Sequence, residues 1–351
     1  TSGATAAING GSTMGTDDAR IVLTAANLTG TAVLNDNKAT ASATANWATN
    51  ILTAEAGTEM LNLGNSTTIT TNIGLAANTA GFALQNIQMG TADIYSSVTN
   101  LDIETGLTSL DGIASVDNNT VLSQSRGQVA QSSLVLNAGT TLNCSASLAN
   151  AQINEGAISS AINPASTAGN IGLTVSNING AVSVDNNKVQ ASSTANLAMN
   201  SMNIAGALAA SDGGSAGTLG QLTATADYVA LNAQRNQASV SSVVRNYNIA
   251  LNSAASTLGT ASVSGNTILA DATGNSATNT FTITPKVGFN TADFAFTGYQ
   301  FNTGNTISSS ISNASIGLTS GGGTGTFSAT GNRIGATAVG NVSVSTIRSG
   351  K

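Results

Sequence analysis

The chain repeats one asparagine-rich motif five times, and this repetition restricts the possible folds more than any other feature. Residues 34–50 and 184–200 are identical at nine of seventeen positions without a gap. Three further copies lie near 116–132, 263–279 and 329–345. The shared pattern is N-x-h-x-A-x-x-x-G/A-N-x-A-x-N, where h is apolar. A unit that recurs in this way predicts a repeat architecture in which each copy packs against its neighbours.

The amide side chains of the motif are the candidate site residues. They would be aligned if the copies were stacked, and they are Asn37, Asn46, Asn50, Asn119, Gln128, Asn187, Asn196, Asn200, Asn266, Asn275, Asn279, Asn332 and Asn341. Several fall on an apparently inward face, where each unmade hydrogen bond costs roughly 1–3 kcal/mol. We therefore expect these side chains to bond to one another along the stack, or to the backbone of turns.

The spacing of the copies alternates. The first asparagines of successive copies are 82, 68, 79 and 66 residues apart. This long-short series indicates that the larger unit is a pair of repeats. Upstream of most copies lies a second apolar element, as at Ile171-Gly172-Leu173 and Ile249-Ala250-Leu251. The repeat is therefore expected to contain several strands.

Alternation within the motif has a period of two, which favours strands over helices. Val189, Ala191 and Ser193 fall on one side of an extended chain, and beyond Ala195 the apolar side switches. A small residue at such a switch suits a bend or a bulge. Alanine favours helices, but no i, i+3, i+4 apolar stripe is sustained. The sequence thus predicts an all-β fold, an elongated β-solenoid (β-helix) built from about five degenerate repeats.

The domain organisation follows from where the repeats begin. We expect an N-terminal segment over 1–20 and a single elongated repeat domain over 21–351. Two coil sizes are compatible with the spacing. Coils of about 20 residues would give about 17 turns and a rod of roughly 80 Å. A wider coil that uses one whole repeat per layer would stack the motif copies directly. Handedness also remains open.

Composition excludes several classes of function. Charged residues are 7% of the chain and histidine is absent, whereas an ordinary enzyme carries roughly a quarter charged residues. No enzymatic activity and no cofactor are therefore expected. Lysine and arginine are scattered singly, so no nucleic-acid partner is expected. Cys144 has no partner for an internal disulfide and is expected to be a small buried hydrophobe. A start at Thr1 and a low charge suit an exported, mature protein.

Acidic pairs are the only catalytic candidates. Asp102 and Glu104 alternate in a strand-like segment, and Asp17 and Asp18 are adjacent near Arg20. Polysaccharide-cleaving enzymes use pairs of carboxylates. Such enzymes usually bring basic and aromatic residues for the sugar, and neither pair sits among a group of such residues. Solvated charges are the favoured interpretation.

Two other motifs resemble ligand sites. The Asn-Asp-Asn and Asp-Asn-Asn turns at 35–37, 117–119 and 185–187 resemble calcium loops, but the last two copies of the turn contain no acid. Plain turns are favoured. Gly321–Gly325 resembles a phosphate-binding loop, yet the Gly-Lys-Ser/Thr ending is missing. A flexible loop between coils is the favoured interpretation.

Regularly spaced Asn and Gln beside Gly and Ala, as in Gly274-Asn275-Ser276-Ala277 and Gly127-Gln128-Val129-Ala130, resemble the curli family of secreted bacterial amyloid subunits. The same features are similar to asparagine- and alanine-rich β-solenoid proteins of bacterial surface attachment, including holdfast anchors. These resemblances imply export, end-to-end strand addition, and a fibre or adhesin role. The long, unequal repeats differ from the short regular ones of curli.

The expected function is structural. We expect a secreted or cell-surface subunit that self-associates into filaments by end-to-end β-strand stacking, for biofilm formation or adhesion. Outer-membrane secretion or anchoring proteins and polysaccharide are the other partners considered. The alternative is a monomeric adhesin that binds polysaccharide along the solenoid face. An ice-binding face formed by Thr67–Thr71 and Phe281–Thr284 is less favoured, because such rows are too few.

Overall fold

The computed structural model describes residues 3–9, 20–57, 61–62, 67–70, 76–164, 168–208, 215–219, 222–285, 292–303 and 305–349. Every regular element in these ranges is a β-strand, so the prediction of an all-β fold is confirmed. No helix that could span a membrane occurs among the described residues.

Five ladders of parallel strands, named A, B, C, D and F, form the body of the molecule. Ladder A contains β1 (Ala4–Asn9), β9 (Ile94–Thr99), β14 (Ile158–Ile162), β21 (Val240–Arg245) and β26 (Ile307–Ser312). Ladder B contains β2 (Arg20–Leu28), β10 (Asp102–Leu110), β15 (Gly169–Ile178), β22 (Tyr247–Thr257) and β27 (Ser315–Ser320). Ladder C contains β3 (Thr31–Val33), β11 (Ile113–Ser115), β16 (Ala181–Ser183), β23 (Thr260–Ser262) and β28 (Thr326–Ser328).

Ladders D and F complete the body. Ladder D contains the long strands β4 (Lys38–Ala56), β12 (Thr120–Asn143), β17 (Lys188–Leu208), β24 (Thr267–Pro285) and β29 (Arg333–Ser349). The short β5 (Leu61–Asn62) pairs with the end of β12. Ladder F contains β8 (Phe82–Gly90), β13 (Ala146–Asn154), β20 (Tyr228–Asn236) and β25 (Phe294–Asn302). A separate antiparallel sheet, named E, contains β6 (Thr67–Thr70), β7 (Ala76–Ala80), β18 (Ser215–Leu219) and β19 (Leu222–Ala226).

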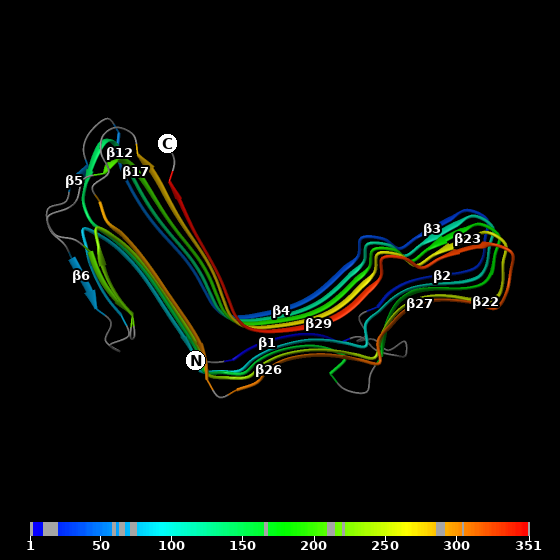
Figure 1. Cartoon of the computed structure of the whole chain (residues 1–351). Helices are drawn as coiled ribbons and strands as arrows, with labels where there is room; N and C mark the ends of the chain where they lie inside the picture. The colour runs from blue at the N-terminus through cyan, green and yellow to red at the C-terminus, as the bar shows by residue number, and fades with distance from the viewer. Residues whose placement is uncertain are drawn as a thin grey trace.

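Each turn of the chain forms one layer, and the layers stack with their strands parallel (Figure 1). Layer 1 contains β1–β4, and layer 2 contains β8–β12. Layers 3, 4 and 5 contain β13–β17, β20–β24 and β25–β29. A complete turn runs through ladders F, A, B, C and D in that order. The fold is a parallel β-solenoid, as predicted.

Each coil uses one whole repeat, which is the wider of the two coil sizes compatible with the motif spacing. In ladder D, Gln128 pairs in register with Asn46 of the layer before and with Asn196 of the layer after, so the motif copies lie directly on one another. The alternative of 20-residue coils and a rod of roughly 80 Å is wrong. Four spacings of about 4.8 Å separate the outermost layers, so the stack is only about 20 Å deep. The molecule is extended across the layers, in two arms that meet at a bend (Figure 1).

The antiparallel sheet explains the alternating repeat length. Hairpin β6–β7 follows the ladder D strand of layer 1, and β18–β19 follows that of layer 3. In layer 2, β12 leads into β13 through residues 144–145 alone. The two hairpins pair with each other through β7 and β18. The long spacings of 82 and 79 residues therefore belong to the two layers that carry a described hairpin.

Ladder D forms one wall of the flattened coil and faces two ladders in turn. Its first half packs on ladder A through small residues, among them Ala195 and Ala272, and its second half packs on ladder F through Met202 and Phe281. In β24 the buried side chains alternate up to Ala272, and Gly274 and Asn275 are then buried in succession. The predicted switch of the inward face is thus confirmed. It lies where ladder D passes from ladder A to ladder F.

Left-handed backbone occurs at one corner in all five layers and at a second corner in layers 2 to 5. The residue before the first motif asparagine has a positive φ in every copy, as at Asn186 (57°) and Gly265 (68°). In layers 2 to 5 the residue that directly follows the ladder A strand is an asparagine with positive φ, namely Asn100, Asn163, Asn246 and Asn313. Asparagine, aspartate and glycine tolerate this conformation best. The Asp-Asn-Asn segments are therefore turns set by backbone geometry.

One buried tyrosine connects three layers. Tyr247 of layer 4 donates its hydroxyl hydrogen to the carbonyl of Leu101 in layer 2, at 3.0 Å. Its ring crosses Gly169 of layer 3, where a Cβ atom would lie 2.4 Å from the ring. The glycine therefore leaves space for the tyrosine.

Candidate assembly interface

The first motif asparagines form a continuous row through all five layers. Each donates Nδ2–H to Oδ1 of the next, at 2.9 Å from Asn37 to Asn119, 3.0 Å to Asn187, 3.1 Å to Asn266 and 3.2 Å to Asn332. The backbone N–H of each donor residue bonds to the same Oδ1 atom. All these bonds point from layer 1 toward layer 5. The expected asparagine stack is present here.

Backbone carbonyls complete the bonding of this row. The Nδ2 atoms of Asn187 and Asn266 also donate to the carbonyls of Val116 and Val184, one layer back. Both asparagines are fully buried. Each interior amide therefore has partners above and below, which removes the cost of burying it.

A second row is interrupted. It contains Asn46, Gln128, Asn196, Asn275 and Asn341 in register. Asn196 donates to Asn275 at 2.7 Å, and Asn275 donates to Asn341 at 2.8 Å. Neither amide atom of Gln128 has a partner, and Oδ1 of Asn196 has none either. The expectation that Gln128 continues the amide stack is wrong, because its longer side chain does not place the amide in line.

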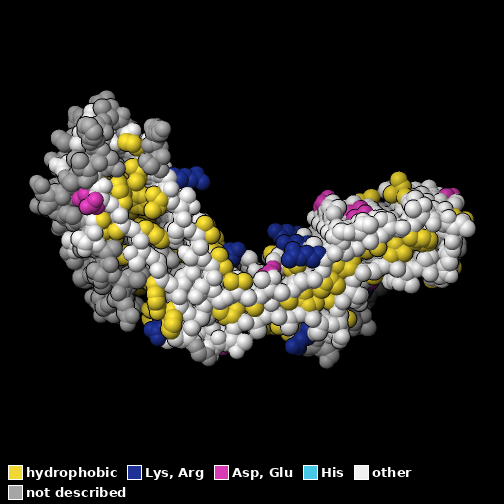
Figure 2. Space-filling view, viewed as in Figure 1, with side chains coloured by type: hydrophobic (Ala, Val, Ile, Leu, Met, Phe, Trp, Pro, Cys, Tyr) yellow, Lys and Arg dark blue, Asp and Glu magenta, His cyan; other side chains and the backbone are white. Residues whose placement is uncertain are grey.

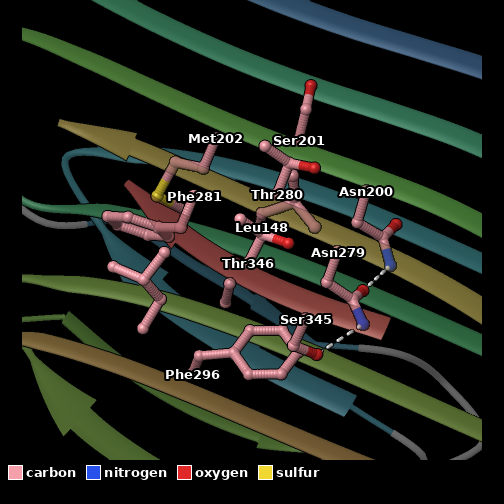
Figure 3. A pocket seen from close by; sticks show the side chains of 12 residues that line it. Leu148, Asn200, Ser201, Met202, Asn279, Thr280, Phe281, Phe296, Ser345 and Thr346 are labelled. Atoms are coloured by element: carbon pink, nitrogen blue, oxygen red, sulfur yellow. Dashed lines mark hydrogen bonds between the residues drawn. The ribbon is translucent and has the colours of Figure 1, made fainter. Parts of the chain in front are cut away.

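A third row contains Asn50, Ser132, Asn200, Asn279 and Ser345. Asn200 donates to Asn279 at 2.9 Å, and Asn279 donates to Ser345 at 3.3 Å (Figure 3). Nδ2 of Asn50 has no partner, because Ser132 is too short to reach it. Beside this row, Met202, Phe281 and Phe296 line a narrow gap between ladders D and F (Figure 3).

Glutamines in ladder F form a further row that the sequence analysis did not find. Gln152 donates Nε2–H to Gln88 at 2.9 Å, Gln234 to Gln152 at 2.8 Å and Gln300 to Gln234 at 2.7 Å. These bonds point from layer 5 toward layer 1. Each Nε2 atom also donates to a carbonyl of ladder D, as Gln88 does to Val129. The glutamine row therefore connects ladder F to ladder D by hydrogen bonds.

An asparagine row lies two residues before the glutamines. Asn86 donates to Asn150 at 2.6 Å, and Asn150 donates to Asn232 at 2.8 Å. The signal for both rows is an Asn-x-Gln triplet, which recurs in β8, β13 and β20. In β25 the triplet reads Gly298-Tyr299-Gln300, without the asparagine. The pattern is therefore not visible in all four strands of ladder F.

Layer 5 exposes side chains whose counterparts in the inner layers are buried in the core. Ile334 of layer 5 is 46% exposed, whereas Ile268 at the same position in layer 4 is fully buried. Ile347 is 65% exposed and its counterpart Phe281 is 4% exposed. In the space-filling view a band of hydrophobic side chains follows the strands along both arms (Figure 2). Among the described residues, no helix or crossing loop covers either end.

The two ends are chemically complementary. The first asparagine row ends at Asn332 in layer 5, where the backbone N–H points beyond the stack. At the other end it begins at Asn37 in layer 1, where Oδ1 points beyond the stack. One end thus offers a donor where the other offers an acceptor. Backbone groups of the outermost strands are likewise available for pairing. This arrangement can accept a further layer of the same kind at either end.

Asp102 and Glu104, the two described carboxylates among those considered as catalytic, each have a partner within ladder B. Glu104 pairs with Arg20 at 3.0 Å. Asp102 accepts a hydrogen bond from the backbone N–H of Asn170, and burial, followed by the charge of Glu104, raises its pKa. Asp17 and Asp18 lie outside the described residues. Within the described ranges no group of three or more acidic or cysteine side chains could hold a metal ion.

The acids of the Asp-Asn-Asn turns bond along the stack. Oδ1 of Asp117 accepts the backbone N–H of Asp185 at 2.8 Å, and Oδ1 of Asp185 accepts that of Ser264 at 2.6 Å. Burial raises the pKa of Asp117, and the charges of Asp185 and Asp36 add to this effect. These oxygens are turned toward the next layer of turns.

The glycine-rich loop, the threonine segments and Cys144 were the other features singled out in the sequence. Gly321–Gly325 forms the loop between β27 and β28, within layer 5 and not between coils. In the segment 281–284, Thr282 and Thr284 alternate with the buried Phe281 and Ile283. Their neighbours in register in layer 3 are Asn203 and Ala205, so no threonine row runs across the layers. The side chains of Thr67–Thr71 lie outside the described residues. Cys144 is fully buried as expected, and burial raises the pKa of its thiol to about 11.

No protein-family model, curated protein or solved structure matches the chain.

Proposed function

We propose that the chain is the structural subunit of an extracellular fibre or surface-attachment assembly, which grows by stacking layer 5 of one copy on layer 1 of the next. The donor at Asn332 and the acceptor at Asn37 carry the proposal, because together they fit a head-to-tail contact between identical copies. Core side chains of layer 5 that are about half exposed, such as Ile334, support the same contact. The charged fraction of only 7% keeps the electrostatic repulsion between stacked copies low.

The contact between two copies would resemble the packing between neighbouring layers within one chain. In-register stacking would place Ile334 over Ala39 and would continue the backbone ladders through the junction. Apolar burial contributes about 25 cal/mol for each Å² removed from water. Such a contact closes no ring when it is repeated, so it generates a filament.

A charge at the open end tests the proposal. Ile334→Lys places an ammonium group within the proposed contact, on a side chain that is already nearly half exposed in the single chain. We expect this variant to stay monomeric in sedimentation velocity under conditions where the unmodified chain forms filaments in negative-stain electron microscopy. Thr278→Lys is the matched control, because Thr278 is exposed on the outer face of layer 4. Filaments should persist in that variant. Monomers of the unmodified chain at high concentration would contradict the proposal.

A further inference from the structure

Ladder D gathers on one face basic side chains that are scattered along the sequence. Its strands contain five of the ten lysines and arginines of the chain, namely Lys38, Arg126, Lys188, Arg333 and Arg348. The acidic residues of the same strands are Glu55 and Asp271. All of these side chains occupy outward positions in the alternation of their strands. Five positive and two negative charges give this outer face a formal charge of +3, on a chain whose net charge is −6.

The positive charges of this face have no ionic partner among the described residues. The salt bridge within the described ranges joins Arg20 and Glu104, in ladder B. The acid in layer 4, Asp271, accepts a hydrogen bond from the amide of Gln190 at 2.8 Å. The outer face of ladder D can therefore attract an anionic partner.

The bend makes this face concave. Ladder D lies on the inner side of the bend, and its outer face looks into the hollow between the two arms (Figure 1). Basic side chains on both arms face that hollow (Figure 2). A concave surface with one sign of charge focuses the electric field and raises the local concentration of molecules of the opposite charge.

An open groove of about 400 Å³ crosses the strands of ladder D at the bend. Two adjacent columns of outward side chains from layers 1 to 4 line it, and all of its lining residues are uncharged. The columns include Gln131, Met199 and Thr278 in one and Ser133, Ser201 and Thr280 in the other. Because the columns follow the stacking direction, the groove offers hydroxyl and amide groups at intervals of about 4.8 Å.

We infer that this groove binds a linear polysaccharide that carries carboxylate groups, with the sugar chain running along the stacking direction. The polar groups of Gln131, Ser201 and Thr280 form hydrogen bonds with sugar hydroxyls, and Met199 packs on the apolar face of a sugar ring. Arg126 on one arm and Arg348 on the other attract the carboxylates. The groove belongs to a single chain, so the inference holds whether or not copies stack.

The spacing of the charges favours a sugar chain over a nucleic acid. Lys38, Lys188 and Arg333 are in register two layers apart, with threonine in the layers between, so their spacing is about 10 Å. Duplex DNA carries one charge per roughly 1.7 Å of its axis. Single-stranded nucleic acids are held by stacking of bases on aromatic rings. No residue that lines the groove within the described part of ladder D is aromatic.

A fluorescently labelled oligogalacturonate is the probe, and its fully methyl-esterified form is the matched control, with the same backbone and no charge. We expect the charged form to bind at least about tenfold more tightly in fluorescence anisotropy with monomeric protein. Its affinity should fall as the NaCl concentration rises, because salt screens exposed charges. Equal affinity for the two forms would overturn the inference, as would equally tight binding of single-stranded DNA of the same length.

Removal of the flanking charges gives a second test. We expect the double variant Arg126→Gln and Arg348→Gln to bind oligogalacturonate about fivefold more weakly, since each exposed ion pair contributes little. The matched control is Arg235→Gln with Arg245→Gln, which removes the same charge from exposed positions in ladders F and A. Equal losses in the two double variants would show that net charge alone matters and would contradict the groove.

A bulky, uncharged side chain in the groove gives a third test. Ser201→Tyr fills the groove without changing the charge of the face, so we expect affinity to fall at least about tenfold. Thr108→Tyr, at an exposed position in ladder B, is the control and should bind normally. Thermal melts show whether each variant is folded. Unchanged affinity in folded Ser201→Tyr would place the polysaccharide elsewhere and overturn the inference.

Discussion

Asparagine has two separate tasks in this chain, and its backbone position decides which one it performs. At the corners, Asn100, Asn163 and Asn186 adopt positive φ and let the chain change direction. One residue beyond the second corner, Asn187 has its side chain inside the stack and bonds to both neighbouring layers. The neighbouring positions therefore share a residue type for unrelated reasons. A single substitution at either kind of site is expected to act by a different mechanism.

Gln128 offers a test of the amide rows. Replacing it by asparagine shortens the side chain to the length used in the layers on either side, so that its amide can donate to the unpaired Oδ1 of Asn196. We expect Gln128→Asn to raise the free energy of unfolding by about 1–2 kcal/mol, measured by chemical denaturation. Gln131→Asn is the control, because Gln131 faces outward on the same strand. A comparable gain in the control would show that asparagine favours this strand for some other reason.

The titration of Asp117 makes the stability of the folded chain depend on pH. Its raised pKa means that the folded chain binds more protons than the unfolded chain between 3.8, the ordinary value for aspartate, and the raised value. Stability therefore falls as pH rises through this window. We expect Asp117→Asn to flatten that part of the stability curve in thermal melts between pH 3 and 7. The gain at neutral pH is a fraction of a kcal/mol, since the side chain is partly exposed and its charge is screened. Asp111→Asn is the exposed control. A pH profile unchanged by Asp117→Asn would refute this assignment.

Among the elements, the long strands of ladder D were the most predictable from sequence. Their period-two alternation and their phase switch are visible because small and apolar residues such as Ala191 and Ala195 recur at fixed offsets. Ladder F was not predictable in the same way. Its strands share little beyond an Asn-x-Gln triplet, and both of their faces are buried in β13, so alternation disappears. The hairpins left only an indirect trace, the unequal spacing of the motifs.

The ring of Tyr247 leaves no room for a side chain at Gly169. A Cβ atom at position 169 would lie 2.4 Å from the ring of Tyr247, so Gly169→Ala must displace the ring and its bond to Leu101. We expect a loss of about 1–3 kcal/mol in the free energy of unfolding. Gly106→Ala, in the neighbouring strand of ladder B, should cost less because its Cβ would meet only Thr24, at 3.7 Å. Equal losses at the two positions would argue against the role of the tyrosine.

For the whole molecule, stability should be graded along the stack. The core side chains of layer 3 have neighbours on both sides, and Val189 is fully buried, whereas Ile334 of layer 5 is nearly half exposed. We expect backbone amide hydrogens of β17 to exchange most slowly and those of β4 and β29 fastest in the monomer. Assembly should slow exchange in β4 and β29 selectively. Uniform exchange across the layers would mean that the stack opens only as one unit.

The size of the coil could not be derived from the sequence. Both a 20-residue coil and a coil of one whole repeat place the motif on strands, and both bury alanine and asparagine. What distinguishes them is the partner of each strand, which is decided by contacts between residues 66 to 82 positions apart. Composition predicted the thin, weakly charged interior of the molecule. It contained no information on which layer each side chain would meet.

The width of the coil has a mechanical consequence. Backbone hydrogen bonds between layers run along the stacking direction, and every layer contains several strands held to the next layer in this way. Tension applied in that direction is therefore shared by all the ladders at once, and no ladder can yield alone while the others remain paired. A narrow coil of the same chain length would distribute the same force over far fewer bonds. We expect rupture to demand high force and to occur over a short extension, as in a brittle and not an elastic material.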